Sequence, residues 1–387
     1  MTPYYSSDGV SIYHGNVLDV LPQLPAGLAR TCVTSPPYWG LRDYGTAEWA
    51  GGDPACDHGV QRWEGPKQTQ GAQSGHASKA DKLARERCER CGAVRVDCQL
   101  GLEPTPEQYV ANMVAVFREV RRVLTDDGTL WLNLGDSFWG GKGANGTSKA
   151  LGNAGERGYQ QPRGTVVSAM RPQDGRHDVL KPKDLIGIPW RVTLALQADG
   201  WYLRSDIIWH KPNPMPESVT DRPTKSHEYL FLLAKSDRYY YDHAAIAEPI
   251  MAVSQARLRR GTSDQHKNAD GAPGQPRHTG AVHAPRPYDP TREVPETRNK
   301  RTVWTVQPRP YPGAHFATYP PELIEPCVKA GSAPGDTVLD PFNGSGTTGE
   351  VAQKWGRRYV GVELNRDYIE LSKQRFVQRP LFGHDAA

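Results

Sequence analysis

The sequence predicts an α/β protein built around a mostly parallel, doubly wound sheet. Two observations lead to this fold class. Short apolar runs of strand length alternate along the chain with segments of helical periodicity. In addition, two predicted strands end in turn-forming sequences, Ser-Pro-Pro-Tyr after residue 34 and Asn-Gly-Ser-Gly after residue 342. Because parallel strands need crossover connections, this alternation is typical of a parallel sheet with helices on both faces.

Each element is placed by its hydrophobic periodicity and by the turn residues that bound it. Strands are predicted at 10–16, 28–35, 129–136, 200–210, 227–236, 336–340 and 358–364, and helices at 17–24, 105–128 and 321–330 and between the last two strands. Thr105 is expected to cap the second helix, since Gln108 completes the capping-box spacing. The strand at 227–236 leads through a polar turn into Arg-Tyr-Tyr-Tyr-Asp at 238–242, which predicts an antiparallel hairpin.

Composition limits the classes of protein to consider. The chain has 387 residues, of which 39 are Gly and 33 are Pro, and its formal net charge is +4. This length suits one large domain with insertions or two domains, and the net charge alone does not indicate a nucleic-acid partner. The sequence has no apolar run long enough to span a bilayer and no signal-peptide pattern at its start, so we expect a cytoplasmic protein without a membrane partner. In that reducing compartment the six cysteines are expected to be free thiols or metal ligands.

Three polar stretches interrupt the alternating pattern, at residues 46–99, 138–182 and 251–310. The first carries four of the six cysteines, the second is a basic, glycine-rich stretch that we expect to be flexible, and the third holds eleven Lys/Arg against five Asp/Glu. Long stretches of this kind in a compact domain are usually functional or disordered. The folded core is therefore expected to comprise residues 1–45, 100–250 and 311–387, with these stretches inserted.

A glycine turn near the C-terminus predicts a nucleoside site. A strand ends at Asp340, Gly344 and Gly346 permit a tight turn, and the next strand ends at Glu363, at the spacing of about 20 residues that places an acidic side chain on ribose hydroxyls. The turn lacks the lysine of a Walker loop and the G-x-G-x-x-G spacing of a dinucleotide site. The candidate ligand-binding residues are Asp340, Pro341, Phe342, Asn343, Gly344, Ser345, Gly346, Thr347, Thr348 and Glu363.

A second motif, TSPPYWG at residues 34–40, directly follows a predicted buried strand. Two consecutive prolines cannot continue a helix or a central strand, so the chain must turn there in a rigid corner.

Together these motifs resemble those of the β-class amino-group DNA methyltransferases, which depend on S-adenosylmethionine. DPFNGSGTT looks like their cofactor loop and TSPPYW like their catalytic motif, and the catalytic motif comes first, as in the β-class. HFATYPPEL, which begins at His315, is similar to the segment before the cofactor loop, and GNVLDVL, around Asp19, resembles the acidic turn beside the cofactor adenine. WHKPNPMPES and SHEYLFLLAKS match later segments. The resemblance covers 10–45, 100–137, 185–245 and 298–375, and it implies a Rossmann-like methyltransferase sheet.

The corner can be given a chemical role from its residue types. An exocyclic base amine is conjugated with its ring and is a poor nucleophile, so hydrogen-bond acceptors must orient it toward the methyl donor. The Ser35 hydroxyl and the Pro36 carbonyl, which Pro37 holds rigidly, are the expected acceptors. Tyr38 offers a flat face on which a base flipped out of double-stranded DNA can stack. Transfer is expected to be direct and to depend on positioning.

The target base follows from the resemblance. In this family a serine at the position of Ser35 usually accompanies methylation of the cytosine 4-amino group, whereas Asp or Asn accompanies adenine 6-amino methylation. We expect cytosine, and adenine is the alternative. Carbon-5 methylation needs a cysteine nucleophile, and Cys327 lies in a predicted helix, where a small buried residue is the expected role. Two further classes of function compete with this prediction, a catalytically inactive DNA-binding module and an RNA or protein methyltransferase.

The first insertion predicts a structural zinc site. Cys88 and Cys91 form a C-x-x-C pair, and Cys56 and His58 provide a second pair, which suits tetrahedral zinc. The C-x-H spacing is tighter than usual, and Cys98 is a substitute ligand. A polar segment of this kind could hardly fold without such a staple.

The third insertion occupies the position of the target-recognition region in the resembled class. Its excess of positive charge suits contacts with DNA phosphates. The candidate residues are Arg257, Arg259, Arg260, Arg298 and Arg301. A cognate restriction endonuclease is a candidate partner. The sequence alone gives neither the existence of that partner, nor the recognition site, nor the oligomeric state.

Overall fold

The computed structural model describes residues 1–40, 46–58, 87–88, 90–140, 177–260, 293–309 and 319–377. The chain divides into two compact units, one formed by Met1–Tyr241 with Thr302–Ala387 and the other by Asp242–Arg301. Most of the predicted insertion at 138–182 lies outside the described residues. Within the described parts, no helix is both long enough and apolar enough to cross a membrane.

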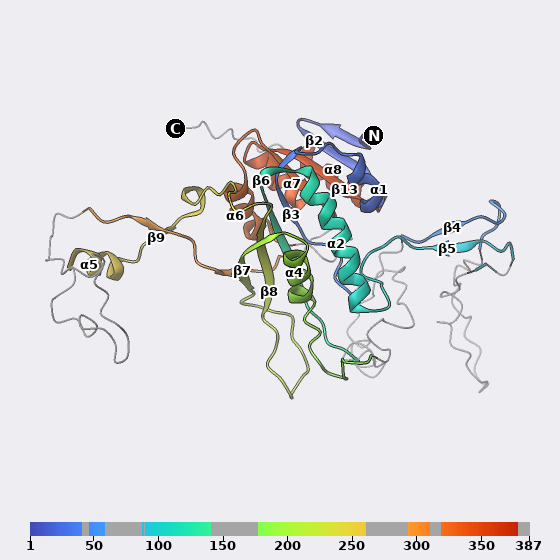
Figure 1. The fold of residues 1–387 in the computed structure, drawn as a ribbon, viewed down its shortest axis with the longest axis horizontal. Helices are drawn as coiled ribbons and strands as arrows, with labels where there is room; N and C mark the ends of the chain where they lie inside the picture. Colours follow the sequence, from blue (N-terminus) through green and yellow to red (C-terminus); the bar gives the residue numbers. More distant parts are fainter. Residues whose placement is uncertain are drawn as a thin grey trace, which may run out of the picture. The chain divides into compact units, whose positions relative to one another are not determined.

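The first unit is built on a nine-stranded sheet (Figure 1). Its strands are β1 Tyr5–Ser7, β2 Val10–His14, β3 Ala29–Thr34, β6 Leu124–Leu134, β7 Tyr202–His210, β8 His227–Ala234, β11 Val303–Thr305, β12 Thr337–Asp340 and β13 Arg358–Glu363. In space they follow the order β1-β2-β13-β12-β3-β6-β8-β7-β11. The strands from β2 to β6 are parallel, and β8 runs antiparallel to both of its neighbours. The predicted α/β sheet with an antiparallel strand is confirmed.

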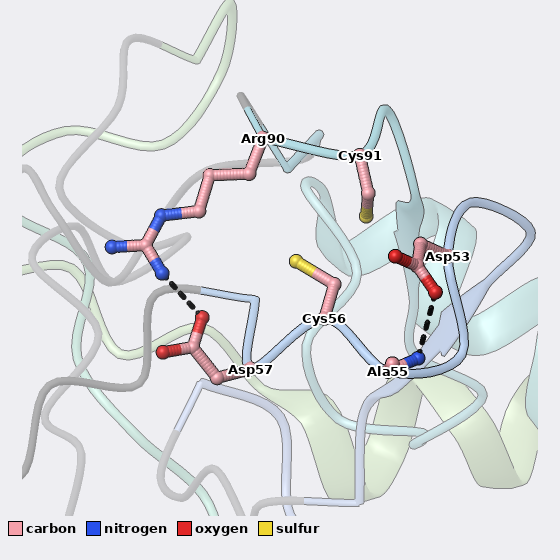
Figure 2. A pocket seen from close by; sticks show the side chains of 6 residues that line it. All are labelled: Asp53, Ala55, Cys56, Asp57, Arg90 and Cys91. Atoms are coloured by element: carbon pink, nitrogen blue, oxygen red, sulfur yellow. Dashed lines mark hydrogen bonds and ion pairs between the residues drawn. The ribbon is translucent and has the colours of Figure 1, made fainter.

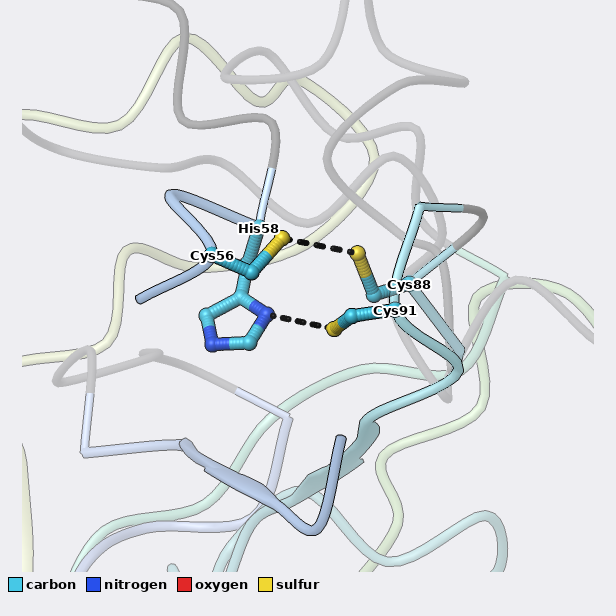
Figure 3. Close-up of side chains that lie close together, drawn as sticks. All are labelled: Cys56, His58, Cys88 and Cys91. Carbon is cyan, nitrogen blue, oxygen red and sulfur yellow. Dashed lines mark hydrogen bonds between the residues drawn. The ribbon is translucent and has the colours of Figure 1, made fainter. Parts of the chain in front are cut away.

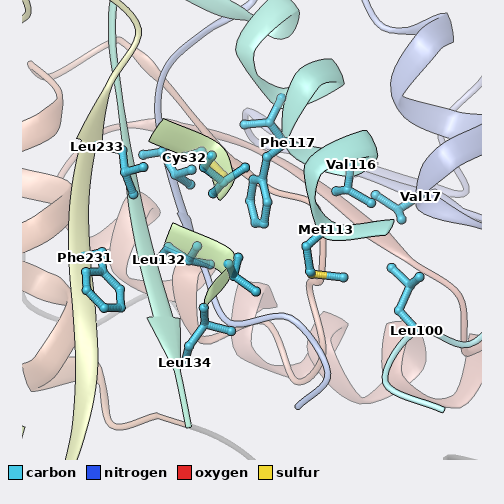
Figure 4. Packing of buried hydrophobic residues seen from close by; sticks show 14 of the residues in the cluster. Val17, Cys32, Leu100, Met113, Val116, Phe117, Leu132, Leu134, Phe231 and Leu233 are labelled. Atoms are coloured by element: carbon cyan, nitrogen blue, oxygen red, sulfur yellow. The ribbon is translucent and has the colours of Figure 1, made fainter. Parts of the chain in front are cut away.

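Helices cover both faces of the sheet. They are α1 Val17–Val20, continued by a 3-10 turn at Leu21–Gln23, α2 Pro106–Val123, α4 Ile188–Ala198, α6 Pro321–Gly331, α7 Thr347–Lys354 and α8 Arg366–Val377. Cys32 and Leu132 share a core with Met113 and Phe117 of α2 (Figure 4). The alternate residues face α6, where a Cβ built on Gly331 would lie 2.6 Å from Thr31 Oγ1. The period-2 alternation of the strands thus sends neighbouring residues into two helical layers.

The cap predicted for α2 is present. The Gln108 N–H donates to Thr105 Oγ1 at 3.2 Å, which satisfies one of the free donors at the start of the helix. The helix is shorter than predicted, because it ends at Val123 and the chain enters β6 at once with Leu124.

The hairpin predicted from residues 238–242 is wrong. Strand β8 is bonded to β6 on one edge and to β7 on the other, so no edge is left for a further strand. Each tyrosine of this segment instead contacts a different partner. Tyr240 donates its N–H to Asp127 O at 2.8 Å, Tyr239 accepts from Arg204 Nε at 3.0 Å, and Tyr241 stacks on Trp131.

The adjacent strands β12 and β3 form a topological switch point. After β12 the chain passes through α7 to β13, whereas after β3 it passes through α2 to β6, on the opposite side of the sheet order. Connections that leave in opposite directions open a crevice at the carboxyl ends of such strands, and ligands of doubly wound sheets bind there. The glycine turn follows β12, and the Ser-Pro-Pro-Tyr corner follows β3.

The smaller elements lie outside this sheet. Within the first unit, β4 (Glu48–Ala50) pairs with β5 (Val94–Val96). The second unit contains a 3-10 turn at Ala244–Ile246, β9 (Glu248–Pro249), α5 (Ala252–Arg260) and β10 (Thr297–Arg298), and β9 pairs with β10. The predicted recognition region at 251–310 overlaps this unit, and its role remains a prediction.

Candidate active site

The glycine turn is organised around Asp340, which ends β12 and is 1% exposed. Its Oδ1 accepts from Thr34 Oγ1 at 2.6 Å and from the Phe342 N–H at 3.0 Å, and its Oδ2 accepts from Thr348 Oγ1 at 2.8 Å and from Tyr319 OH at 3.4 Å. Burial raises the pKa of Asp340, and the hydroxyl donors oppose that rise. This carboxyl group therefore joins strand β3, the turn and helix α7.

Glu363 ends β13 beside the turn. Its Oε2 accepts from the Gly344 N–H at 2.7 Å and its Oε1 from the Asn365 N–H at 2.9 Å. Burial raises the pKa of Glu363 to about 7. Each carboxylate oxygen has more than one lone pair, so both oxygens can accept a further hydrogen bond from a ligand hydroxyl.

Most of the remaining residues of the turn are buried, and its two glycines have the backbone that the turn needs. Gly344 and Gly346 have φ of 50° and 80°, in the left-handed region that favours glycine. Asn343 Oδ1 accepts from Tyr359 OH at 2.9 Å, which fixes the turn to strand β13. Thr347 begins α7, where free backbone N–H groups suit a carboxylate. Ser345, Thr347 and Thr348 are buried, Pro341 is buried, and Phe342 is half-buried against the core.

Two of the predicted cofactor residues lie apart from the turn. Asp19 is exposed on α1, which follows β2. His315 lies outside the described residues. Sequence reasoning gave no role to Asn16, which lies two residues after the end of β2 at the same sheet edge and caps α1 by accepting from the Leu18 N–H at 3.1 Å. Its position after a strand and before a helix was the available signal.

The Ser-Pro-Pro-Tyr corner lies next to the turn because β3 and β12 pair in parallel. It is fixed from the side of α2, where Tyr109 OH donates to Pro37 O at 2.8 Å. Pro36 is buried, and Ser35, Pro37 and Tyr38 are half-buried. The chain leaves the corner at Gly40, whose N–H donates to Gly101 O at 2.8 Å. The corner is thus tied to a helix and to the end of the first insertion.

Tyr38 is held by residues from two other strands, β6 and β8. Its hydroxyl lies 2.8 Å from Glu228 Oε2 and 2.9 Å from Asn133 Oδ1, and Ser35 Oγ is 3.4 Å away. Lys211 forms an ion pair with Glu228. Burial and the Glu228 charge raise the pKa of Tyr38 well above its ordinary value, so the phenol keeps its proton.

Sequence reasoning assigned no role to Glu228, Asn133 or Lys211. They meet because β8 is antiparallel, so its first residues lie at the edge where β6 and β7 end. A Cβ built on Gly135 would lie 2.4 Å from the Tyr38 ring, so only glycine leaves room for the ring there.

The structure places the cysteines in different surroundings. Cys327 is fully buried in α6, which agrees with the expected role of a small buried residue. The four predicted metal ligands, Cys56, His58, Cys88 and Cys91, come together, with their ligand atoms within 4.8 Å of one another (Figure 3). Cys98 is exposed.

The predicted DNA-contacting arginines lie in the second unit. Arg298 and Arg301 both donate from Nε to Glu248 Oε1, at 2.9 and 2.6 Å. Arg257, Arg259 and Arg260 belong to α5.

Comparisons with known proteins agree with this arrangement. A family model described as DNA methylase matches residues 29–374. The chain is 42% identical over 370 residues to the type II methyltransferase M.XycI of Xanthomonas campestris pv. cyanopsidis, across 95% of this chain and 87% of that protein. It is 40% identical over 369 residues to the type II methyltransferase M.Cfr9I of Citrobacter freundii, across 95% and 88%. The solved structure of the PvuII DNA methyltransferase (cytosine-N4-specific) shares the fold, with a TM-score of 0.53, 14% identity and coverage of 98% of this chain and 91% of that one.

Proposed function

The chain belongs to the DNA methylase family of the N6/N4 amino-group class, and from this membership we propose that it methylates the 4-amino group of cytosine in double-stranded DNA. As a member of this family it is an S-adenosylmethionine-dependent DNA methyltransferase. The observation that supports methyl transfer at this site is the hydrogen bond of 2.6 Å from Thr34 to Asp340, which brings the corner and the glycine turn together.

The glycine turn has the chemistry that the cofactor requires. The Glu363 carboxylate can accept hydrogen bonds from the ribose hydroxyls. The backbone N–H groups at the start of α7 can donate to the carboxylate of the methionine part. Bound S-adenosylmethionine supplies an electrophilic methyl group on its sulfonium. Asp340 acts as a positioning residue, because all four of its contacts are made within the protein.

The corner then orients the amine that receives the methyl group. The Ser35 hydroxyl and the Pro36 carbonyl accept hydrogen bonds from the exocyclic N–H groups and direct the nitrogen lone pair toward the cofactor. The flipped base stacks on Tyr38, whose ring is held in place by Glu228 and Asn133. Catalysis depends on positioning and on fixed dipoles, so no covalent enzyme intermediate is required.

Ser35 is the feature that favours cytosine over adenine, through the family tendency for serine at this position. A hydroxyl can orient either amine, so adenine 6-amino methylation is the second candidate. The described corner residues and glycine turn are complete, which counts against an inactive DNA-binding module.

Double-stranded DNA and a cognate restriction endonuclease are the proposed partners, since the relatives named above are type II methyltransferases. The basic stretch at 251–310 is the proposed recognition region. Part of its charge is already paired, because Glu248 binds both Arg298 and Arg301.

Nucleoside mass spectrometry tests the proposal. Purified protein is incubated with S-adenosylmethionine and unmethylated DNA, and the DNA is digested to nucleosides. We expect 4-methylcytosine, in the wild type and in a Cys327→Ala control. The appearance of 6-methyladenine would overturn the assignment of the base while keeping the family and the cofactor, and 5-methylcytosine that disappears in Cys327→Ala would overturn the proposed chemistry.

A further inference from the structure

The polar insertion contains a cluster that the methyl-transfer site does not use. Cys56 and His58 approach Cys88 and Cys91 across the sequence gap, and their thiol and imidazole groups converge on one point (Figure 3). A pocket lined by Asp53, Ala55, Cys56, Asp57, Arg90 and Cys91 opens against the cluster, so it can be reached from solvent (Figure 2).

Two distances within the cluster match the edges of a zinc tetrahedron, and all four ligand atoms lie within 4.8 Å of one another. With Zn–S near 2.3 Å and Zn–N near 2.0 Å, tetrahedral coordination separates two sulfurs by about 3.8 Å and a sulfur from a nitrogen by about 3.5 Å. Cys56 Sγ lies 3.8 Å from Cys88 Sγ, and Cys91 Sγ lies 3.5 Å from His58 Nδ1. The two sulfurs are too far apart for a disulfide, whose S–S length is about 2.0 Å.

The backbone around the cluster holds these side chains in place. Gly92 has φ of 73°, and its N–H donates to Cys88 O at 2.8 Å, which closes the turn that brings the two thiols together. A Cβ built on Gly52 would lie 2.7 Å from Cys91 Sγ. Only glycine at position 52 therefore lets the segment that carries Cys91 approach so closely. His58 has φ of 46°, a costly backbone for a non-glycine residue, and its ring stacks on Trp49 at 4.9 Å.

The described residues of the insertion provide almost no apolar core. Of the residues in 46–58, 87–88 and 90–98 whose burial is described, only Cys88 and Ala93 are buried. The apolar side chains of Val94 and Val96 are exposed. The strands β4 and β5 have three residues each, which is too little to be stable alone. An added crosslink is what segments of this kind require.

We propose that Cys56, His58, Cys88 and Cys91 bind one structural zinc ion, with His58 coordinating through Nδ1. The ion links residues 56–58 to residues 88–91. It thereby closes a loop of the chain that begins at His58 and ends at Cys88. Because the insertion leaves the catalytic corner at Gly40 and returns to it at Gly101, the zinc fixes the base of a segment that starts and ends beside the active site.

Metal analysis of the full-length protein tests the site, with Cys98→Ser as a matched control in the same insertion. We expect roughly one zinc per chain in the wild type and in Cys98→Ser, and a decrease of at least roughly tenfold in Cys88→Ser and Cys91→Ser. Less than roughly a tenth of an equivalent after purification with added zinc, or zinc that persists in both cluster variants, would overturn the proposal.

Cobalt substitution of the wild type keeps the test decisive if the cluster variants fail to fold. Co²⁺ in this site is expected to show the visible absorption and the thiolate charge-transfer bands of tetrahedral sulfur coordination. Titration of Cys98→Ser, which lacks the exposed thiol, with a mercurial should release one metal ion as three thiols react. An octahedral cobalt spectrum, or release without thiol modification, would contradict coordination by these residues.

Discussion

Asp340 and Glu363 are buried carboxyl groups at neighbouring strand ends, yet their surroundings give them different tasks. Asp340 receives donors from Thr34, Phe342, Thr348 and Tyr319, so its capacity is used within the protein. Glu363 receives only backbone donors, from Gly344, Asn365 and Leu364, and keeps lone-pair capacity for a ligand. The sequence placed both residues at the site, but only the contacts distinguish a positioning residue from a ligand.

The raised pKa of Glu363 predicts pH-dependent cofactor binding. Ribose hydroxyls donate to the ionised carboxylate, so binding favours the deprotonated form. With a pKa of about 7, we expect affinity for S-adenosylmethionine to be about tenfold lower at pH 6 than at pH 8, and to level off above pH 8. Calorimetric titration across this range measures the effect.

Glu363→Gln is the control for that titration, because it keeps the shape of the side chain and removes the proton equilibrium. Its affinity is expected to be lower at pH 8 and to lose the tenfold dependence on pH. An equally steep dependence in Glu363→Gln would assign the titration to another group.

At the scale of elements, the sequence predicted what is local and missed what depends on pairing. The turns after β3 and β12 and the cap of α2 depend on neighbouring residues, and they were predicted correctly. The hairpin at 238–242 was wrong because both edges of β8 are occupied, which no local pattern reveals. Glu228 was missed as a partner of Tyr38 for the same reason, since the two meet only through the antiparallel strand.

The packing of α6 on the sheet gives a prediction for this scale. A Cβ at position 331 would approach Thr31 Oγ1 to 2.6 Å and Trp131 Nε1 to 2.9 Å. We therefore expect Gly331→Ala to lower the free energy of unfolding by about 1–3 kcal/mol, measured by urea denaturation. Glu322→Ala, at an exposed position of the same helix, should change it by less than about 0.5 kcal/mol. Equal stability of the two variants would contradict the close packing of α6.

At the scale of the molecule, the site is a consequence of strand order. The two motifs lie far apart in sequence: Thr34 and Asp340, which are hydrogen-bonded, are separated by 306 residues. They meet because β3 and β12 pair at the switch point of the sheet. The motifs could be found from residue types, and the resemblance to methyltransferases related them. Strand order, the second compact unit and the residues behind Tyr38 required the three-dimensional structure.

The central claim is that the corner beside the glycine turn orients the amine for methyl transfer. The most direct measurement is single-turnover transfer from S-adenosylmethionine to DNA by Ser35→Ala, with Ser7→Ala as an exposed serine control. We predict a rate about 100-fold lower in Ser35→Ala, with cofactor affinity and DNA affinity unchanged, and a normal rate in Ser7→Ala. A normal rate in Ser35→Ala would contradict the account.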